Sequence, residues 1–517
     1  MTTVVRVAAG LLGGVVEDGV HAFKGIPFAA PVDGPRRFRP PQRPAPWDGV
    51  RDASQYGPVP AFEPMPGLYG ELSGPRQPAG DDCLSLNVWT PDPGAAGLPV
   101  LVWITGGGFY AGAGTNDVYD GTAFARDGVV AVTVNYRLGF VGFGHLDTLF
   151  PQLEETGNLG LLDQVAALEW VRDNIAAFGG DPAKVTVAGE SAGGAAVAAL
   201  LATPRTEGLF RGAVVQSPHY AAHIGVSATD AAGIAGQLLA EVGVRPGDLD
   251  ALLALTPEAL VKAQNALRMQ LWSTRDLDRF GADAVATLLA FQPTYGTAVL
   301  PEQPIAAIRA GCAADVALLA GTNREEALSF VADIREAFTE PLVRAGIEGA
   351  FGAAGIDADT VLQRYRTARP DAAVHELAAA VETDRLYRIP TLRLADAQAA
   401  HNPNTWVYEF AWRSPVRGGE LGACHYLEVP FVFDRLDNDE ARGYAGDAPP
   451  RDLAAAVHGA WVSFVATGDP NGPRLPEWPR HDPATRPVLV FDAEANGGVT
   501  VAADPAGDQR ALWDAVI

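Results

Sequence analysis

The residues with the clearest chemical potential are in the segment Val185-Thr-Val-Ala-Gly-Glu-Ser-Ala-Gly-Gly194. A short β-branched run leads into the pattern Gly-x-Ser-x-Gly, and a helix-forming run follows to Leu201. This order predicts a strand, a sharp turn with Ser191 at its apex, and a helix. The flanking glycines allow close packing of the turn, and the start of the helix directs backbone N–H groups to the same place. Although such a pattern also arises by chance, the segment predicts that Ser191 is a nucleophile.

A serine nucleophile needs hydrogen-bond donors for the negative oxygen that forms when it attacks a carbonyl group. Gly106-Gly107-Gly108 follow an apolar run at 99–104 that is typical of a buried strand. Backbone N–H groups without side chains can approach a substrate oxygen closely, whereas a tight turn is the alternative interpretation. Because Gly-x-Ser-x-Gly lies downstream, we expect this loop and the N–H of Ala192 to form an oxyanion hole.

The serine also needs a base. Enzymes with this serine turn place an acid and then a histidine after the serine, which disfavours His21, His145, His219 and His223. The histidines that remain are His375, His401, His425, His458 and His481. Segments around His375 and His458 are predicted to be helical, and His481 follows a Pro/Trp loop. His425 ends a Gly-containing loop, 418–425, just beyond a predicted aromatic strand at 405–412, which favours it as the base.

The acid that orients the base has two main candidates. Residues 316–326 predict a strand followed by a turn that carries Glu325 and Glu326. Either carboxylate could orient an imidazole, and the residues alone do not separate the two. Asp384 and Asp434 are weaker alternatives.

The elements that must position these residues alternate between strand and helix patterns. Apolar strand runs occur at 99–104, 129–134, 185–187, 213–215, 316–319, 405–412 and 488–491, and an amphipathic helix is predicted at 161–178. Residues 3–28 predict a small antiparallel sheet, and the Ala/Leu-rich stretches 228–293 and 334–400 predict helices over the main sheet. This alternation indicates an α/β fold with a largely parallel sheet, whose site lies outside the carboxyl ends of the strands.

Composition narrows the class of protein. The 517 residues are 48% hydrophobic and carry a net charge of −24, and no linker or repeat divides them, so we expect one domain, 1–517. The negative charge disfavours nucleic acid and anionic membrane as partners. The N-terminus lacks the pattern of a signal peptide and no apolar run is long enough to span a bilayer. Three cysteines without metal-ligand spacing suggest buried free thiols and a cytoplasmic location.

Taken in order, these motifs resemble the type-B carboxylesterases, a branch of the α/β-hydrolase fold that includes bacterial para-nitrobenzyl esterases and cholinesterases. The resemblance runs nearly from end to end. Its motifs are Phe23-Lys-Gly-Ile-Pro-Phe-Ala29, Asp81-Asp-Cys-Leu-Ser-Leu-Asn-Val-Trp-Thr-Pro91, Gly106-Gly-Gly-Phe109, Asn135-Tyr-Arg-Leu138, Gly157-Asn-Leu-Gly-Leu-Leu-Asp-Gln164, Phe178-Gly-Gly-Asp-Pro182, Gly189-Glu-Ser-Ala-Gly-Gly194, Gln216-Ser217, Gly321-Thr-Asn-Arg-Glu-Glu326 and Cys424-His-Tyr-Leu-Glu-Val-Pro-Phe-Val-Phe433.

The resemblance implies a role for each matching residue. The nucleophile falls on Ser191, the acid on Glu326 and the base on His425. The remaining positions are the oxyanion donors Gly107, Gly108 and Ala192, and Glu190 and Ser217, which support the site in relatives.

The resemblance further implies the α/β-hydrolase fold, with a central mostly parallel sheet flanked by helices, a small N-terminal antiparallel sheet and large helical insertions. The implied activity is hydrolysis of carboxylic esters through an acyl-enzyme intermediate, with no metal or organic cofactor. Lactones, thioesters, carbamates and amides are alternative substrates for the same machinery, and a non-catalytic binding module is the competing class. The implied partner is a small-molecule ester, and the chain is expected to be a monomer or a small homo-oligomer.

Some positions depart from the pattern of the relatives. Thr105 stands where His or Tyr is common, Ala327 replaces a common Gly after the acid, and no cysteine precedes Cys83 to pair with it. A Trp that would bind choline is absent between Trp47 and Trp89, which disfavours choline esters. Several aromatic residues could line an apolar pocket or pack in the core: Phe109, Tyr110, Trp272, Phe291, Phe330 and Trp412.

Overall fold

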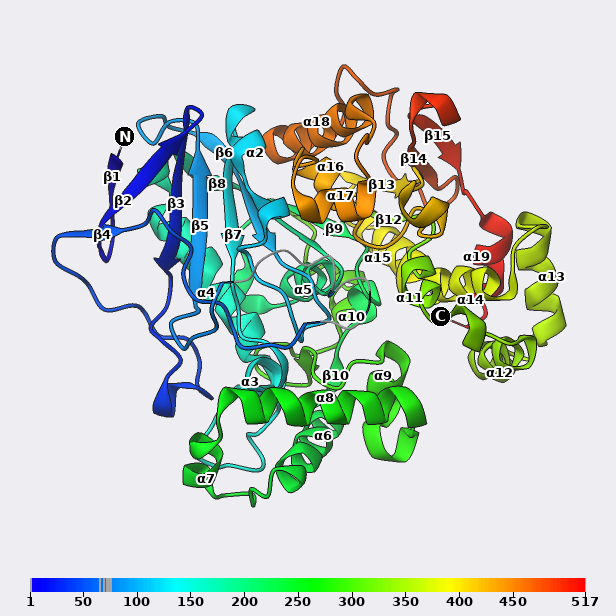
Figure 1. Ribbon diagram of the computed structural model, residues 1–517, viewed down its shortest axis with the longest axis horizontal. Coiled ribbons are helices and arrows are strands. Elements are labelled where there is room, and N and C mark those ends of the chain that lie inside the picture. The colour runs from blue at the N-terminus through cyan, green and yellow to red at the C-terminus, as the bar shows by residue number, and fades with distance from the viewer. Residues whose placement is uncertain (1, 65–66, 68–69, 71–76, 517) are drawn as a thin grey trace.

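One large sheet organises the molecule. A computed structural model describes residues 2–64, 67, 70 and 77–516, so Met1 and Ile517, the ends of the predicted domain, lie outside the described residues. Within this part of the chain thirteen strands join the same sheet, in the order β1-β2-β3-β5-β7-β6-β8-β9-β12-β13-β14-β15, with β4 pairing alongside β2 (Figure 1). Strands β10 and β11 form a separate two-stranded sheet.

The strands are short and mostly buried. Their bounds are β1 Thr2–Val7, β2 Gly10–Glu17, β3 Val20–Pro27, β4 Val50–Asp52, β5 Ser85–Thr90, β6 Leu98–Ile104, β7 Val130–Val134, β8 Gly180–Glu190, β9 Gly212–Gln216, β10 Val226–Ser227, β11 Thr294–Tyr295, β12 Ala317–Asn323, β13 Thr405–Phe410, β14 Pro487–Phe491 and β15 Thr500–Ala503. Strands β7, β6, β8, β9, β12, β13 and β14 pair in parallel. The predicted α/β fold with a largely parallel sheet is therefore confirmed.

The N-terminal strands are antiparallel, as predicted, but they extend the main sheet. Strand β1 pairs with β2, β2 with β3, and β3 with β5, each in antiparallel register. At the opposite edge β15 is antiparallel to β14.

Helices fill the connections between the strands. Their bounds are α2 Thr122–Arg126, α3 Gly139–Phe143, α4 Leu159–Asn174, α5 Ala192–Leu201, α6 Ala228–Glu241, α7 Leu249–Ala254, α8 Pro257–Thr274, α9 Leu277–Thr287, α10 Pro304–Arg309, α11 Leu328–Ala332, α12 Glu340–Phe351, α13 Ala358–Ala368, α14 Val374–Thr383, α15 Ile389–Ala399, α16 Val429–Val432, α17 Asp439–Ala445, α18 Arg451–Thr467 and α19 Gly507–Trp513. The helix predicted at 161–178 is α4, followed by a 3₁₀ turn, Ile175–Phe178, that ends at Gly179 in a left-handed conformation.

Side chains alternate between two cores along the central strand β6. On β6, Val100 and Val102 belong to the core that also contains α4 and α5, whereas Leu101 and Trp103 belong to the core that contains α2 and α18. This period of two is expected for a strand covered on both faces. The sheet is thus enclosed between two layers of helices.

The two long helical stretches differ in how they pack. Helices α6, α8 and α9, at the bottom of Figure 1, share the core of α4 and α5. Helices α12, α13, α14 and α19, at the right of Figure 1, enclose a core of their own around Phe351, Tyr365 and Trp513. No helix in the described ranges is long and apolar enough to cross a membrane.

Four neighbouring strands end side by side, and this edge positions the candidate residues. Ile104 of β6 lies opposite Gly189 of β8, and Glu190 of β8 lies opposite Gln216 of β9. Gln216 in turn lies opposite Gly321 of β12. The glycine loop, Ser191, Ser217 and the Glu325-Glu326 turn therefore leave adjacent carboxyl ends of a parallel sheet, where α/β proteins place their sites.

Candidate active site

Ser191 occupies the apex between β8 and α5. Its backbone angles, φ 58° and ψ −123°, are costly for a residue with a side chain. Ser191 is the one residue from Val185 to Leu201 that is not buried, which means that the strained turn presents it to solvent. At Gly193 an added Cβ would lie 2.1 Å from the carbonyl oxygen of Ile104, so a side chain there would disrupt the turn.

The glycine loop lies directly against this turn. A Cβ on Gly106 would be 3.1 Å from Cβ of Ser191. Gly107 and Gly108 have φ values of 113° and 64°, and both are partly exposed between buried neighbours. Ala192 is the first residue of α5, and the first N–H groups of a helix have no acceptor within it. The predicted oxyanion donors are therefore gathered around Ser191.

Glu326 and His425 form a buried pair. The two atoms Glu326 Oε2 and His425 Nδ1 are 2.7 Å apart, and the side chains are 0% and 6% exposed. The backbone N–H of Asn323 donates to the other oxygen, Glu326 Oε1, at 2.7 Å, and the N–H of His425 donates to the carbonyl oxygen of Glu326 at 3.2 Å. This geometry fixes the imidazole with Nδ1 directed at a carboxylate and leaves Nε2 for proton transfer.

The other candidate acids have different partners. Glu325 forms an ion pair with Arg413 and is not the carboxylate at His425 Nδ1. Asp384 pairs with Arg388 at 2.7 Å, and Asp434 is exposed. The structure thus separates Glu325 from Glu326, which residue types alone did not.

The other four histidines that follow the candidate acid are not the ones at Glu326. His458 Nδ1 contacts the carbonyl oxygen of Val432 at 2.7 Å, and His481 Nε2 contacts Asp396 at 2.8 Å. His375 lies on α14, and His401 Nε2 contacts the carbonyl oxygen of Arg309 at 2.8 Å. Of the histidines that follow the candidate acid, His425 is the one that contacts Glu326 and Glu190.

Glu190 connects the turn to the imidazole. Its Oε1 lies 3.1 Å from Nε2 of His425, and its side chain is 2% exposed. Burial by itself lowers the pKa of His425, but the charge of Glu190 and the hydrogen bond to Glu326 outweigh burial and raise the pKa to about 9. The site therefore favours a positively charged imidazole.

Sequence reasoning did not assign a role to Glu428, although the residue lies in the quoted His425 motif. Glu428 is fully buried and accepts hydrogen bonds from Asn323 Nδ2 at 2.6 Å and Gln216 Nε2 at 3.2 Å. Trp461 Nε1 donates to Gln216 Oε1 at 2.8 Å and extends the network. Burial and the charge of Glu326 raise the pKa of Glu428 to about 7. Glu326 and Glu190 thus contact the imidazole, and the charge of Glu428 also acts on it.

Ser217 lies at the end of β9, beside the serine turn. It has a left-handed φ of 39°, and its N–H donates to the carbonyl oxygen of Gly321 at 2.8 Å. Its hydroxyl group is buried and has no hydrogen-bond partner within the described part of the chain. The position supports the strand ends on which Ser191 and the Glu326 turn are built.

Two aromatic rings contact the imidazole of His425. The ring centroid of Tyr387 is 4.8 Å and that of Phe330 is 5.5 Å from the imidazole centroid. Tyr387 carried no signal in the sequence because it comes from a π-helical turn, Asp384–Arg388, within a longer helical run. Six aromatic residues were expected to line a pocket or to pack in the core. Phe330 contacts His425, whereas Trp272 is 54% exposed. The other four are buried in the core: Phe109, Tyr110, Phe291 and Trp412.

No group of three or more His, Cys, Asp or Glu side chains that could hold a metal ion occurs within the described ranges. The three cysteines are free, with Cys83 and Cys424 buried and Cys312 exposed. The candidate site consists of a serine, an imidazole, carboxylates and backbone N–H groups. These groups can carry out nucleophilic attack on a carbonyl carbon with transfer of a proton.

Comparison with known proteins agrees with this arrangement. The profile of the carboxylesterase family matches residues 1–512. The para-nitrobenzyl esterase of Bacillus subtilis (strain 168) is 38% identical over 511 residues, which cover 98% of this chain and 97% of that protein. The phenmedipham hydrolase of Pseudarthrobacter oxydans is 34% identical over 97% of both chains. Among solved structures, a thermophilic para-nitrobenzyl esterase superposes with a TM-score of 0.84 at 36% identity, covering 99% of this chain and 100% of that one. The Geobacillus stearothermophilus carboxylesterase EST55 superposes with a TM-score of 0.81 at 37% identity and the same coverage.

Proposed function

The chain belongs to the carboxylesterase family and is a carboxylic ester hydrolase, and from this premise we propose that it cleaves esters through an acyl-enzyme formed on Ser191. The observation that carries the proposal is the buried 2.7 Å contact between Glu326 and His425, whose Nε2 faces the residue next to Ser191. A strained, solvent-facing serine beside a glycine loop completes the set of groups that such a reaction needs.

In the first half of the reaction, Ser191 Oγ attacks the ester carbonyl carbon while His425 Nε2 takes the hydroxyl proton. The carbonyl oxygen becomes an oxyanion, which the N–H groups of Gly107, Gly108 and Ala192 bind. Loss of one such donor costs about 3–4 kcal/mol of transition-state stabilisation in comparable enzymes. The bond to the alcohol oxygen then breaks, and the proton on His425 passes to the departing alcohol.

In the second half, water replaces the alcohol. The water oxygen attacks the acyl carbon while His425 takes a proton from the water. The acyl–Ser191 bond breaks, and the serine oxygen recovers the proton from His425. In both halves Glu326 holds the imidazole and stabilises its positive charge, so no proton needs to move to the carboxylate.

The substrate class is a small-molecule carboxylic ester. The relative named para-nitrobenzyl esterase supports an ester that carries an uncharged aromatic group. The two rings beside His425, Tyr387 and Phe330, are consistent with an apolar substrate, because they place apolar surface next to the reacting centre.

Hydrolysis of para-nitrophenyl acetate and butyrate at neutral pH tests the proposal. We expect turnover by the wild type and a fall of about 10⁶ in kcat in folded Ser191→Ala. A fluorophosphonate should label the wild type at Ser191 and leave Ser191→Ala unlabelled. Turnover that persists in Ser191→Ala contradicts the proposed nucleophile. If the wild type neither turns over these esters nor is labelled, the binding-module interpretation replaces the enzyme.

We also propose a cytoplasmic location and a monomeric or small homo-oligomeric assembly. The free state of the three cysteines suits a reducing compartment. Cell fractionation checks the location, and light scattering during size-exclusion chromatography checks the assembly.

A further inference from the structure

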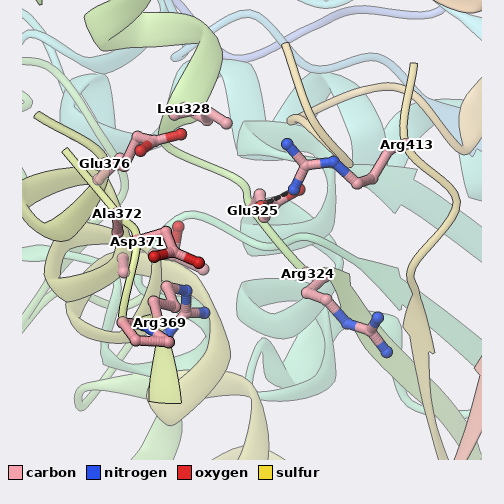
Figure 2. A pocket seen from close by; sticks show the side chains of 12 residues that line it. Arg324, Glu325, Leu328, Arg369, Asp371, Ala372, Glu376 and Arg413 are labelled. Atoms are coloured by element: carbon pink, nitrogen blue, oxygen red, sulfur yellow. Dashed lines mark hydrogen bonds and ion pairs between the residues drawn. The ribbon is translucent and has the colours of Figure 1, made fainter. Parts of the chain in front are cut away.

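Glu325, the carboxylate that does not contact His425 Nδ1, contacts the loop that carries His425. Its Oε1 forms an ion pair with Arg413, drawn as a dashed line in Figure 2. Its Oε2 accepts a hydrogen bond from the backbone N–H of Ala423 at 2.9 Å, and its own backbone N–H donates to the carbonyl oxygen of Ala423 at 2.9 Å. One residue therefore binds the loop through both its side chain and its backbone.

The loop is shaped to receive this carboxylate. Gly422 has a φ of 59°, and an added Cβ would lie 2.4 Å from Glu325 Oε2. Only a residue without a side chain leaves room for the carboxylate and adopts this conformation without strain. The Glu325 side chain is 17% exposed, and on its open side lies a cavity of about 310 Å³ bounded by Arg369, Glu376 and other residues of Figure 2.

The contact between Glu325 and Ala423 lies two residues before His425. The neighbouring backbone contact joins His425 to Glu326, the candidate acid. The N–H of His425 donates to the carbonyl oxygen of Glu326 at 3.2 Å, directly after the two bonds between Glu325 and Ala423. Residues 423–425 and 325–326 are therefore joined along their backbones. Since a hydrogen bond to a charged group is stronger than one between neutral groups, the bond from the Ala423 N–H to the Glu325 carboxylate is stronger than the two backbone–backbone bonds beside it.

We propose that Glu325 is a positioning residue that fixes the His425 loop so that Nδ1 of the imidazole meets Glu326. The inference rests on the proposed roles of His425 and Glu326. Positioning matters because a displacement of about 1 Å at a reacting group can cost about a hundredfold in rate.

A neighbouring ion pair offers a matched control. Glu420 lies on the same loop and pairs with Arg335, and the two side chains are 45% and 50% exposed. Glu420→Gln removes one negative charge from the same loop without touching the bonds between Glu325 and Ala423. A difference in kcat between Glu420→Gln and the Glu325 variants therefore reflects the contact between Glu325 and Ala423 rather than the local charge.

The experiment compares Glu325→Gln, Glu325→Ala and Glu420→Gln in steady-state hydrolysis of para-nitrophenyl butyrate. The amide of Glu325→Gln can still accept from Ala423 but no longer pairs with Arg413, so kcat should fall about tenfold. Glu325→Ala loses both contacts, and its kcat should fall about a hundredfold, with KM within about twofold of the wild type. Labelling of Ser191 by a fluorophosphonate should slow by the same factors. Glu420→Gln should match the wild type.

The pH profile separates positioning from stability alone. If the His425 loop moves away from Glu326, the hydrogen bond that helps raise the pKa of His425 weakens, and the rising limb of kcat/KM should move to lower pH in Glu325→Ala. A folded Glu325→Ala with wild-type kcat overturns the inference. A lower melting temperature with an unmoved pH limb also overturns it, as does an equal loss in Glu420→Gln. Failure of the proposed function itself is recognised separately, by turnover in Ser191→Ala.

Discussion

Glu190 Oε1 lies 3.1 Å from Nε2 of His425, so the residue before the candidate nucleophile faces the ring nitrogen that would take the serine proton. Both side chains are buried, 2% and 6% exposed, so water and salt screen the charge of Glu190 little. A negative charge at this distance favours the imidazolium that forms during attack. The ring is therefore held between Glu326 at Nδ1 and Glu190 at Nε2.

This relationship predicts an alkaline pH dependence. His425 must be neutral to take a proton, and its raised pKa, about 9, keeps it protonated at neutral pH. We therefore expect kcat/KM to rise with pH from neutrality to about 9 and then level off. In Glu190→Gln the largest cause that raises this pKa is absent, so the limb should move to lower pH. The measurement is kcat/KM for para-nitrophenyl butyrate against pH, with Glu420→Gln as the control. An unmoved limb in Glu190→Gln contradicts the role of this charge.

Glu326→Gln tests the acid. In the variant the amide oxygen can accept the Asn323 N–H, which leaves an NH₂ group facing His425 Nδ1. Because two donors then face each other, the imidazole is expected to adopt the wrong tautomer, and kcat should fall by about 10⁴, the size seen when the acid of a serine protease is replaced in this way. Circular dichroism confirms folding, and steady-state kinetics gives the loss. A fall in kcat of less than about tenfold would mean that another residue is the acid.

The arrangement of the site could be predicted from the sequence where local patterns determine geometry. The Gly-x-Ser-x-Gly turn and the glycine loop each follow a buried strand, and parallel pairing brings their carboxyl ends together. The choice between Glu325 and Glu326 depended on tertiary contacts, because both follow the same strand and differ only in direction. Glu325 faces Arg413, whereas Glu326 faces His425.

Other features of the site carried no local signal. Tyr387 reaches His425 from a π-helical turn nearly 40 residues before it, and Glu428 becomes part of the site through Asn323 and Gln216, which belong to two other strands. Such contacts arise from packing between segments far apart in the chain. The N-terminal strands were predicted as a small sheet, but whether they stand alone depends on the pairing of β3 with β5, which periodicity does not determine.

Gly107→Ala tests the oxyanion loop. At a φ of 113° the new Cβ would lie 2.1 Å from the carbonyl oxygen of Ala111, so the loop must move and its N–H groups turn from the oxyanion. We expect kcat to fall by about 10²–10³. Gly128→Ala is the matched control, because Gly128 also has a positive φ, 82°, with nothing within 4 Å of an added Cβ. The control should lose stability slightly and keep its activity. Equal losses of activity in the two variants would mean that backbone strain, not the oxyanion hole, is being measured.

Asp163→Asn tests a buried ion pair that holds the loop after β7 to helix α4. Asp163 and Arg137 are 0% and 2% exposed, and the carboxylate accepts from Arg137 Nη2 at 2.7 Å, from Nε at 2.8 Å and from the backbone N–H at 2.9 Å. Burial raises the pKa of Asp163 against the pull of Arg137, so the pair depends on both partners. Removing one charge leaves the guanidinium buried without compensation, which should cost about 3–5 kcal/mol. Asp437→Asn, which breaks an exposed pair with Arg451, should cost less than about 1 kcal/mol. Urea denaturation of the two variants measures the difference, and similar midpoints would show that the buried pair contributes no more than a surface one.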